Sequence, residues 1–205
     1  MTIERPMQTL RTETMQQQGL RHGRASCSIL LLCVFLTGMA WPQHTVTSYD
    51  VEAAYLYNFG KFVRWPADTD AGTAPFTICI LGEDPFGQKL DMLIANESVQ
   101  GRPIVAKRVA AASATEACQI VFLGSSEEPK LAKDLAELQK RPMLTVSNMP
   151  DFVERGGMIQ FLQINNTVRF EVNLSSAQQS GLALSSELLK VAVTVNTKTA
   201  QEVKP

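Results

Sequence analysis

The chain has 205 residues, of which 45% are hydrophobic and 19% are charged, and its formal net charge is −1. This composition is typical of one domain with a substantial apolar core and excludes a disordered or fibrous protein. It carries no block of like charge that would attract a phosphate backbone, so DNA and RNA are poor candidate partners. Its two histidines, His22 and His44, precede every segment expected to fold, which removes the usual general base of hydrolases and most zinc sites.

The first 40 residues are predicted to be a cleavable signal peptide. Arg21 and Arg24 precede an apolar run at residues 29–39, and small residues precede a cut after residue 40. The run is shorter than the roughly 20 residues of a membrane-spanning helix, so a cleaved secretory signal is favoured over a permanent anchor. The polar leader is long for a signal, and Met15 is an alternative start.

Two cysteines, Cys79 and Cys118, stay in the chain after cleavage. Removal of residues 1–40 takes away four basic and two acidic residues and leaves 15 basic against 18 acidic ones. In an oxidising compartment the two cysteines are expected to form a disulfide, which closes a loop of about 39 residues and contributes about 4 kcal/mol in the chain-entropy model. The alternative is two buried free thiols. A metal site is disfavoured, because no nearby histidine completes a tetrahedral zinc.

The mature chain is predicted to begin with a helix. Apolar residues recur at spacings of three and four from Val51, with Ser48 as the expected N-cap and Trp65 followed by a proline at the end. The apolar run Phe76–Leu81 predicts a buried strand, and a turn and a helical stretch to about Ile94 follow it. This order is that of a β-turn-α unit.

Strand and helix patterns then alternate along the chain. Strands are expected at residues 104–109, 119–123 and 143–146, with an alanine-rich helical piece near residues 113–117 and a helix from Ser126, its expected N-cap, through Lys140. Strands separated by helices predict an α/β fold with a mainly parallel central sheet flanked by helices. In the common doubly wound order, the first and third strands are neighbours and bring Cys79 and Cys118 together.

The last third of the domain is predicted to contain an antiparallel hairpin. A short helix at residues 151–155 precedes strands at 158–164 and 168–174, which are joined at Asn165 and Asn166. Apolar residues in the second strand alternate with Arg169, Glu171 and Asn173, so one face is expected in the core and the other in solvent.

A helix broken near Gly181 and resumed to about Ala192 is expected to end the domain. The organisation is therefore predicted as a signal peptide at 1–40, an α/β domain at 41–192 and a flexible tail at 193–205.

Candidate catalytic groups are few. Glu83 and Asp84 follow the first strand, where open α/β sheets bind ligands, but a capping role at a helix start is the favoured interpretation because no third acidic residue ends another strand. Ser125 and Ser126 have no histidine or nucleophile elbow to activate them. No glycine-rich phosphate loop follows any strand, so neither an enzyme nor a cofactor is expected.

The first helix is rich in aromatic residues, and these are interpreted as a packing face, with a groove for a partner or small ligand as the alternative. The members of this group are Tyr55, Tyr57, Phe59, Phe62 and Trp65. The polar side chains of the hairpin are by default a solvated sheet face, although such a face is also a reasonable docking surface.

Several motifs occur in an order that resembles the YfiR-like family of periplasmic proteins. They are AAYLYNFGKFVRWP at residues 53–66, ICILGEDPFG at 78–87, LTVS at 144–147, GGMIQF at 156–161 and VRFEVNL at 168–174. Residues 181–189 resemble the last helix of the family. The resemblance covers residues 48–192, most of the mature chain.

The resemblance implies a small α/β inhibitor without catalytic activity. Such a protein binds the periplasmic sensor region of an inner-membrane diguanylate cyclase of the YfiN type and represses cyclic di-GMP synthesis, and an outer-membrane lipoprotein of the YfiB type sequesters it. A homodimer is a further possibility for this protein. Cys79 and Cys118 match the family disulfide, whereas a second bridge has no counterpart because no cysteine lies near Val153, so strong redox control is not expected.

An inhibitor acts by binding one state of its target more tightly than another, so it needs an interface rather than a pocket. The expected interface is the polar face of the hairpin, with Arg169, Glu171 and Asn173. The alternative function is a periplasmic small-molecule-binding or sensor domain. Its ligand would lie at the carboxyl ends of the strands, near Glu83, Asp84 and Phe86.

Overall fold

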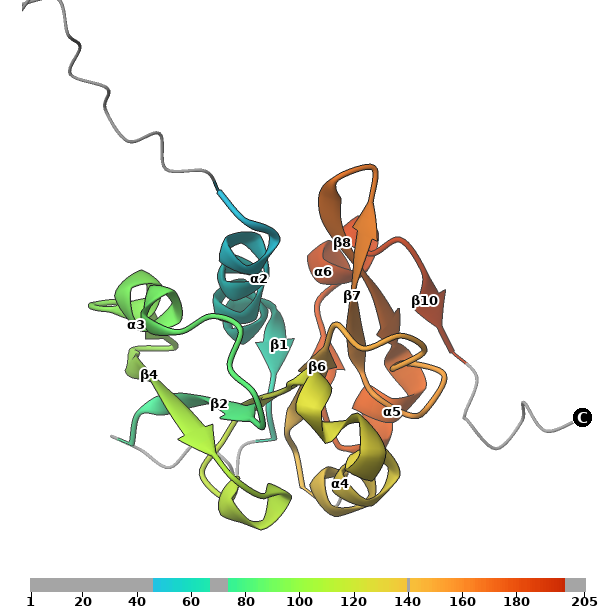
Figure 1. Cartoon of the computed structure of the whole chain (residues 1–205), viewed down its shortest axis with the longest axis horizontal. Coiled ribbons are helices and arrows are strands. Elements are labelled where there is room, and N and C mark those ends of the chain that lie inside the picture. Colours follow the sequence, from blue (N-terminus) through green and yellow to red (C-terminus); the bar gives the residue numbers. More distant parts are fainter. Residues whose placement is uncertain (1–45, 67–73, 140, 198–205) are drawn as a thin grey trace, which may run out of the picture. The chain divides into compact units, whose positions relative to one another are not determined.

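The computed structural model describes residues 46–66, 74–139 and 141–197 (Figure 1). They belong to one compact unit, which begins at Val46. The predicted signal peptide and the alternative start at Met15 lie outside the described residues. No helix in the described ranges has the length and apolar character needed to cross a membrane.

The unit is built on an eight-stranded sheet in the order β10-β8-β7-β6-β5-β2-β4-β3. Strands β4, β2, β5, β6 and β7 run parallel to one another, and β8 runs antiparallel to β7. Short β3 and β10 pair with β4 and β8. The strands are β2 (Phe76–Leu81), β3 (Ser98–Val99), β4 (Arg102–Val109), β5 (Ile120–Leu123), β6 (Leu144–Ser147), β7 (Ile159–Ile164), β8 (Thr167–Asn173) and β10 (Val195–Asn196). The predicted α/β fold with a mainly parallel sheet and a C-terminal hairpin is confirmed.

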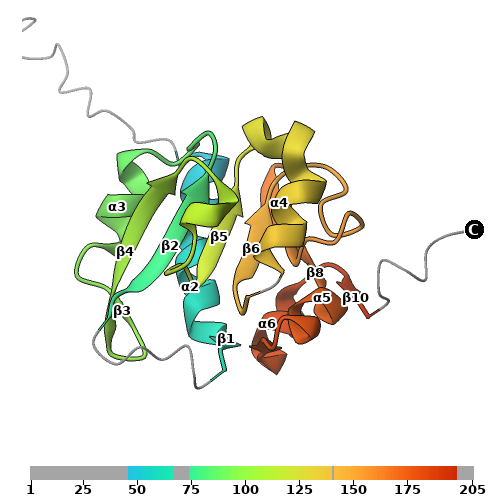
Figure 2. The same cartoon turned by 90° about the horizontal axis from the view of Figure 1, so that it is seen from below.

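Helices cover both faces of this sheet, with α2 and α4 on opposite faces (Figure 2). Strands β1 (Val63–Arg64) and β9 (Ala183–Leu184) form a separate antiparallel pair. The helices are α2 (Ser48–Phe62), α3 (Gln88–Ile94), α4 (Leu131–Leu138), α5 (Leu174–Gln179) and α6 (Ser186–Val191), and the 3₁₀ turns are η2 (Ala112–Ala114) and η3 (Ser125–Lys130).

The α2 face of the sheet is held by aromatic rings. Phe59 stacks on Phe161 at a centroid distance of 5.9 Å and meets Phe170 edge-on at 5.3 Å. Tyr55 lies against the same two hairpin rings. Burying rings of this size contributes several kcal/mol through apolar area alone. At these positions the aromatic residues of the first helix form the packing face that the sequence favoured.

The α4 face contains the disulfide. Cys79 and Cys118 are bonded with their Cα atoms 5.8 Å apart, and β2 and β5 are adjacent, as predicted. Cys79 is fully buried in a cluster that includes Leu131, Leu135 and Leu138, which recur along one side of α4. The bond therefore joins the middle of β2 to the segment just before β5, on the α4 face.

Two expected caps are wrong. Thr47, not Ser48, is the N-cap of α2, because the acid three residues later, Asp50, completes a capping box in which its carboxylate accepts the Thr47 backbone N–H at 2.7 Å. Ser126 does not begin one long helix, since η3 precedes α4. Its hydroxyl instead accepts the backbone N–H of Glu83 at 2.8 Å.

The short helix expected at residues 151–155 is also wrong, because this segment forms turns. Asp151 has a positive φ of 55°, which interrupts a right-handed helix. The side-chain oxygen of buried Gln160 accepts the backbone N–H groups of Phe152 and Val153, so these donors need no helical partner. The ring of Phe152 lies so close to Gly157 that a Cβ there would be 2.1 Å from it.

The segment expected as a flexible tail from residue 193 begins with an ordered strand. Val195 and Asn196 form β10, which pairs in parallel with Val172 and Asn173 of β8. The contact is extended by a hydrogen bond from the Val193 N–H to the Phe170 carbonyl at 2.8 Å. Residues 198–205 lie outside the described residues.

Candidate partner-binding surface

The β7–β8 hairpin extends beyond the strand next to it. Strand β6 pairs with β7 only at Ile159 and Gln160, whereas the β7–β8 ladder continues to the turn at Asn165 and Asn166. Both asparagines have positive φ, 50° and 59°, as a tight two-residue hairpin turn requires. Figure 1 shows the hairpin beside α6 and β10. Among the described residues, no strand pairs with the outer half of β7 on the side away from β8.

The two faces of the hairpin have different environments. Phe161 and Phe170 point to the α2 face, where the rings of that helix cover them. The side chains that alternate with them point the other way, and we call them the hairpin outer face. It consists of Leu162, Ile164, Thr167, Arg169 and Glu171. It combines an exposed arginine and an aliphatic residue, Ile164, that is 38% exposed.

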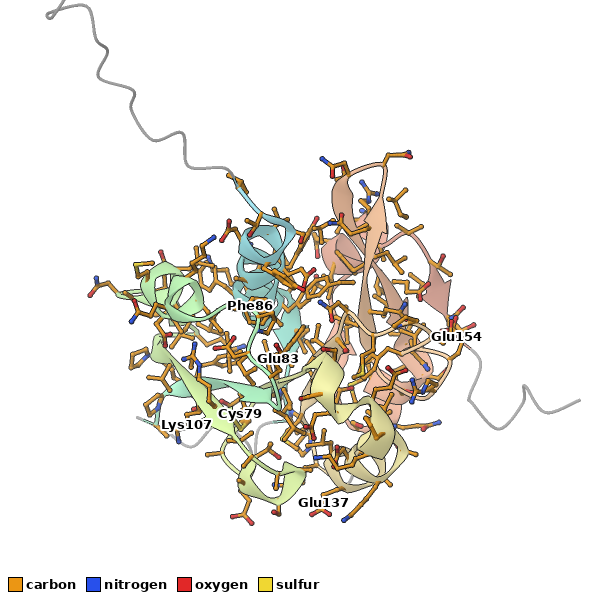
Figure 3. All side chains as sticks on the ribbon, in the orientation of Figure 1. Cys79, Glu83, Phe86, Lys107, Glu137 and Glu154 are labelled. Carbon is orange, nitrogen blue, oxygen red and sulfur yellow. A yellow bond between two sulfur atoms is a disulfide. The ribbon has the colours of Figure 1, made fainter. Side chains whose placement is uncertain are left out.

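The base of the hairpin outer face is acidic. Burial raises the pKa of Glu171, and the nearby negative charges of Glu154 and Asp151 raise it further. Glu154 is labelled in Figure 3. Arg155 of the same turn pairs with Glu128 at 3.3 Å, so its charge is directed to η3. The turn thus brings two carboxylates toward Glu171, which sequence reasoning missed because it expected a helix there.

Asn173 was expected on this exposed face. The structure contradicts this, because Asn173 is only 3% exposed. Its Oδ1 accepts the Ser176 N–H at 3.0 Å and begins α5, and its Nδ2 donates to the Val153 carbonyl at 3.0 Å. These two hydrogen bonds connect β8 to α5 and to the turn that contains Asp151 and Glu154. The expected polar stripe is therefore reduced to Arg169 and the half-buried Glu171.

The crevice expected at the carboxyl ends of β2 and β5 is filled by the chain itself. The N–H of Gly124 donates to the Leu81 carbonyl at 2.9 Å, and a Cβ at Gly124 would lie 2.2 Å from the Glu83 carbonyl oxygen. The Ser126 hydroxyl also contacts this loop, where it accepts the Glu83 N–H. This is the point where the strand order reverses, at which open sheets commonly bind ligands.

Asp84 and Phe86 have structural contacts. Asp84 accepts the backbone N–H of Phe86 at 2.8 Å and pairs with Arg108 at 2.8 Å. Arg108 also pairs with Asp91, and these carboxylates raise the pKa of its guanidinium. Phe86 is 3% exposed and packs edge-on against Phe122. Within the described ranges, no group of three or more acidic, cysteine or histidine side chains is arranged to hold a metal ion.

Comparison with known proteins gives two findings. A model of the YfiR/HmsC-like family matches residues 49–193. Among solved structures, a conserved domain protein from Vibrio cholerae O1 biovar El Tor str. N16961 is similar, with a TM-score of 0.51 and 10% sequence identity. The match covers 74% of this chain and 61% of that chain, less than two thirds of its length. At this identity the likeness concerns the fold alone.

Proposed function

Because the chain belongs to the YfiR/HmsC-like family of periplasmic regulators of diguanylate cyclase signalling, we propose that it represses an inner-membrane diguanylate cyclase of the YfiN type by binding its periplasmic sensor region. Export would use the signal peptide predicted at residues 1–40. A YfiB-type lipoprotein of the outer membrane would release the cyclase by sequestering this protein. Members of this family are regulators rather than enzymes.

We place the cyclase contact on the hairpin outer face. The observation that carries this proposal is the unequal cover of the hairpin, whose α2 face is packed with rings while Arg169 and Ile164 on the other face are exposed. The acidic base formed by Glu171, Glu154 and Asp151 favours a partner surface with basic side chains. Binding shifts the cyclase toward its inactive state only to the extent that this state is bound more tightly.

Glu171→Lys tests the proposed contact, with Lys190→Glu on α6 as the charge-reversal control. We expect Glu171→Lys to weaken binding to the periplasmic region of the host cyclase at least tenfold, in line with a lost charge contact. The introduced lysine would face Glu154 and Asp151, so the folded state should keep its stability. If Glu171→Lys and the control both bind the cyclase as tightly as wild type, the hairpin outer face is excluded as the cyclase contact.

Deletion of the gene in its host tests the function itself. Cellular cyclic di-GMP should rise on deletion and return when the wild-type gene is restored, whereas the Glu171→Lys gene should fail to restore it. A cyclic di-GMP level that does not respond to deletion contradicts the inhibitor proposal, whatever the binding surface.

The alternative is a small-molecule-binding or sensor domain with its ligand near Glu83, Asp84 and Phe86. It has less structural support, since Phe86 is in the core and the adjacent crevice is filled. Thermal-shift screening with nucleotides and amino acids distinguishes the two functions, because a specific ligand must raise the melting temperature by mass action.

A further inference from the structure

A pocket of about 370 Å³ lies at the opposite end of the sheet from Glu83 and Asp84. Its lining comes from the amino-terminal ends of β2 and β4 and from the segments that precede β5 and β6. Lys107 of β4 reaches this region beside Cys79 of β2, its register partner (Figure 3). The volume is within the usual range for small-molecule sites, about 300–1,000 Å³.

The charges around the pocket are mostly positive. Arg102, Lys107 and Arg141 line it, with Glu116 as the acidic member. Arg102 is used to hold the chain, since it donates to the carbonyls of Ala74 at 2.7 Å and of its successor Pro75 at 2.9 Å. It supplies positive charge, Lys107 supplies an accessible ammonium group, and Arg141 contributes a guanidinium to the pocket wall.

Arg141 presents a donor that the described part of the chain does not satisfy. Its Nη2 donates to the Ala112 carbonyl at 3.3 Å, whereas its Nη1 is shielded from solvent and makes no hydrogen bond within the described ranges. A shielded charged donor without an acceptor is costly, and an oxyanion in the pocket would remove that cost once the guanidinium turned toward it.

Lys107 and Gln119 add further donors to the same pocket. Lys107 is exposed and makes no ion pair with any described residue. Gln119 accepts the Thr77 N–H through its side-chain oxygen at 2.8 Å, which fixes the carboxamide and leaves its NH₂ group as a donor. Pro142 and Met143 supply apolar wall next to these groups.

We propose that this pocket binds a small organic anion whose carboxylate or phosphate group is held by Arg141 and Lys107, with its apolar body against Pro142 and Met143. The guanidinium of Arg141 and the ammonium of Lys107 differ in geometry but share a preference for oxyanions. The site is independent of the hairpin outer face, so it concerns an activity beyond cyclase binding.

Isothermal titration of the mature protein at low ionic strength tests the site. The probes are phenyl phosphate, benzoate and inorganic phosphate, which separate phosphate from carboxylate recognition and test whether the apolar body contributes. We expect saturable binding of one organic anion per chain, weakened at least tenfold in Lys107→Gln and in Arg141→Gln. Lys190→Gln on α6 should bind like the wild type.

Two controls keep the outcome interpretable. Lys107 is exposed on a strand surface, so Lys107→Gln should fold normally even if Arg141→Gln does not. The assay contains no cyclase, and Lys107→Gln should bind the cyclase normally in the absence of an anion, so failure of this site and failure of the proposed function are distinguishable. Absence of saturable binding in the wild type, or equal binding in wild type and Lys107→Gln, would overturn the proposal.

Discussion

The β2–β5 pair and the β7–β8 hairpin belong to one sheet but are bounded in opposite ways. At the carboxyl ends of β2 and β5, backbone packs on backbone around Gly124. Toward the other end of the pair, the disulfide joins β2 to the segment that precedes β5, on the α4 face. At the hairpin, the ladder extends past β6, and one face keeps its polar side chains exposed. We call these the closed region and the open region.

The two regions differ in whether their polar side chains are available to a binding partner. In the closed region, Asp84, a candidate catalytic group in the sequence, accepts a backbone N–H and pairs with Arg108. In the open region, Arg169 is exposed on a rigid two-stranded support. A protein that acts through an interface can therefore combine a strongly constrained core with an accessible edge of the same sheet.

The largest expected effect is loss of the disulfide in the closed region. The double variant Cys79→Ala/Cys118→Ala should lose about 4 kcal/mol of unfolding free energy, because the 39-residue loop is no longer closed in the unfolded chain. Chemical denaturation of the mature protein measures it. Wild type reduced with a thiol should fall to a similar value, and a loss below about 1 kcal/mol would show that the closed region does not depend on this bond.

The next effect tests the backbone contact that fills the crevice. Gly124→Ala places a Cβ against the Glu83 carbonyl, and the two loops must separate, so we expect a loss of about 2 kcal/mol. Ser125→Ala, at an exposed neighbouring position, should stay within about 0.5 kcal/mol of wild type. Equal stability of the two variants would mean that the loops of the closed region are free to move apart.

Much of the closed region could be predicted from the sequence. The apolar run Phe76–Leu81 is a strand buried on both sides, which a continuous apolar pattern indicates. The disulfide followed from two facts, the presence of only Cys79 and Cys118 after the signal and the neighbouring positions of their strands in a doubly wound order. Both inferences depend on local pattern and chain topology.

The features that the sequence did not predict depend on side chains that form hydrogen bonds with the backbone of other segments. Gln160 satisfies the amides of Phe152 and Val153, so a helical pattern became turns. Asn173 alternates like a surface residue but turns its carboxamide to a helix start and a carbonyl. The strands β1, β9 and β10 have two residues each, too few for a periodic signal.

The candidate site was predicted only in part for the same reason. Alternation along one strand, which is a local property, placed Arg169 and Glu171 on the same face of β8, away from the α2 side. The acidic side chains of Glu154 and Asp151 come to Glu171 through the turn that was expected to be a helix. The anion pocket collects residues from four strand beginnings, and no spacing in the sequence marks them as neighbours.

A pH-dependent effect is expected where α2 meets the residue after β6, the strand that lies between the closed and open regions. Glu52 of α2 is 4% exposed, and burial raises its pKa to about 7 from 4.5, although the side chain of Asn148 donates to it at 3.3 Å and opposes the rise. Between pH 4.5 and 7 the folded state therefore keeps a proton that the unfolded state has lost, so stability falls as the pH rises through this range.

Glu52→Gln tests this link. The full difference in pKa corresponds to about 3 kcal/mol, and relaxation of the folded state around the ionised carboxylate reduces the expected loss to about 1–2 kcal/mol. The variant should show a smaller fall in stability between pH 5 and pH 8 than wild type and exceed wild type in stability above pH 7, as measured by denaturation at these two pH values. Glu137→Gln on α4 is the matched control and should retain the wild-type slope. A wild-type stability that does not fall between these pH values contradicts the buried, protonated state of Glu52.

The smallest effects concern the open region, where Arg169 and Asn173 lie on the same side of β8 but have different surroundings. Asn173→Ala removes the N-cap of α5 and leaves the Val153 carbonyl without its donor, so we expect a loss of about 1 kcal/mol. Arg169→Ala should stay within about 0.5 kcal/mol of wild type, since the side chain is exposed.

Cyclase affinity should show the reverse order, with Arg169→Ala weakening the complex and folded Asn173→Ala binding much like wild type. Both quantities are measurable on the same preparations, by denaturation and by titration with the periplasmic region of the cyclase. An Arg169→Ala variant that loses stability and keeps its affinity would make the outer half of β8 part of the structural core, and the distinction between the open and closed regions would no longer hold.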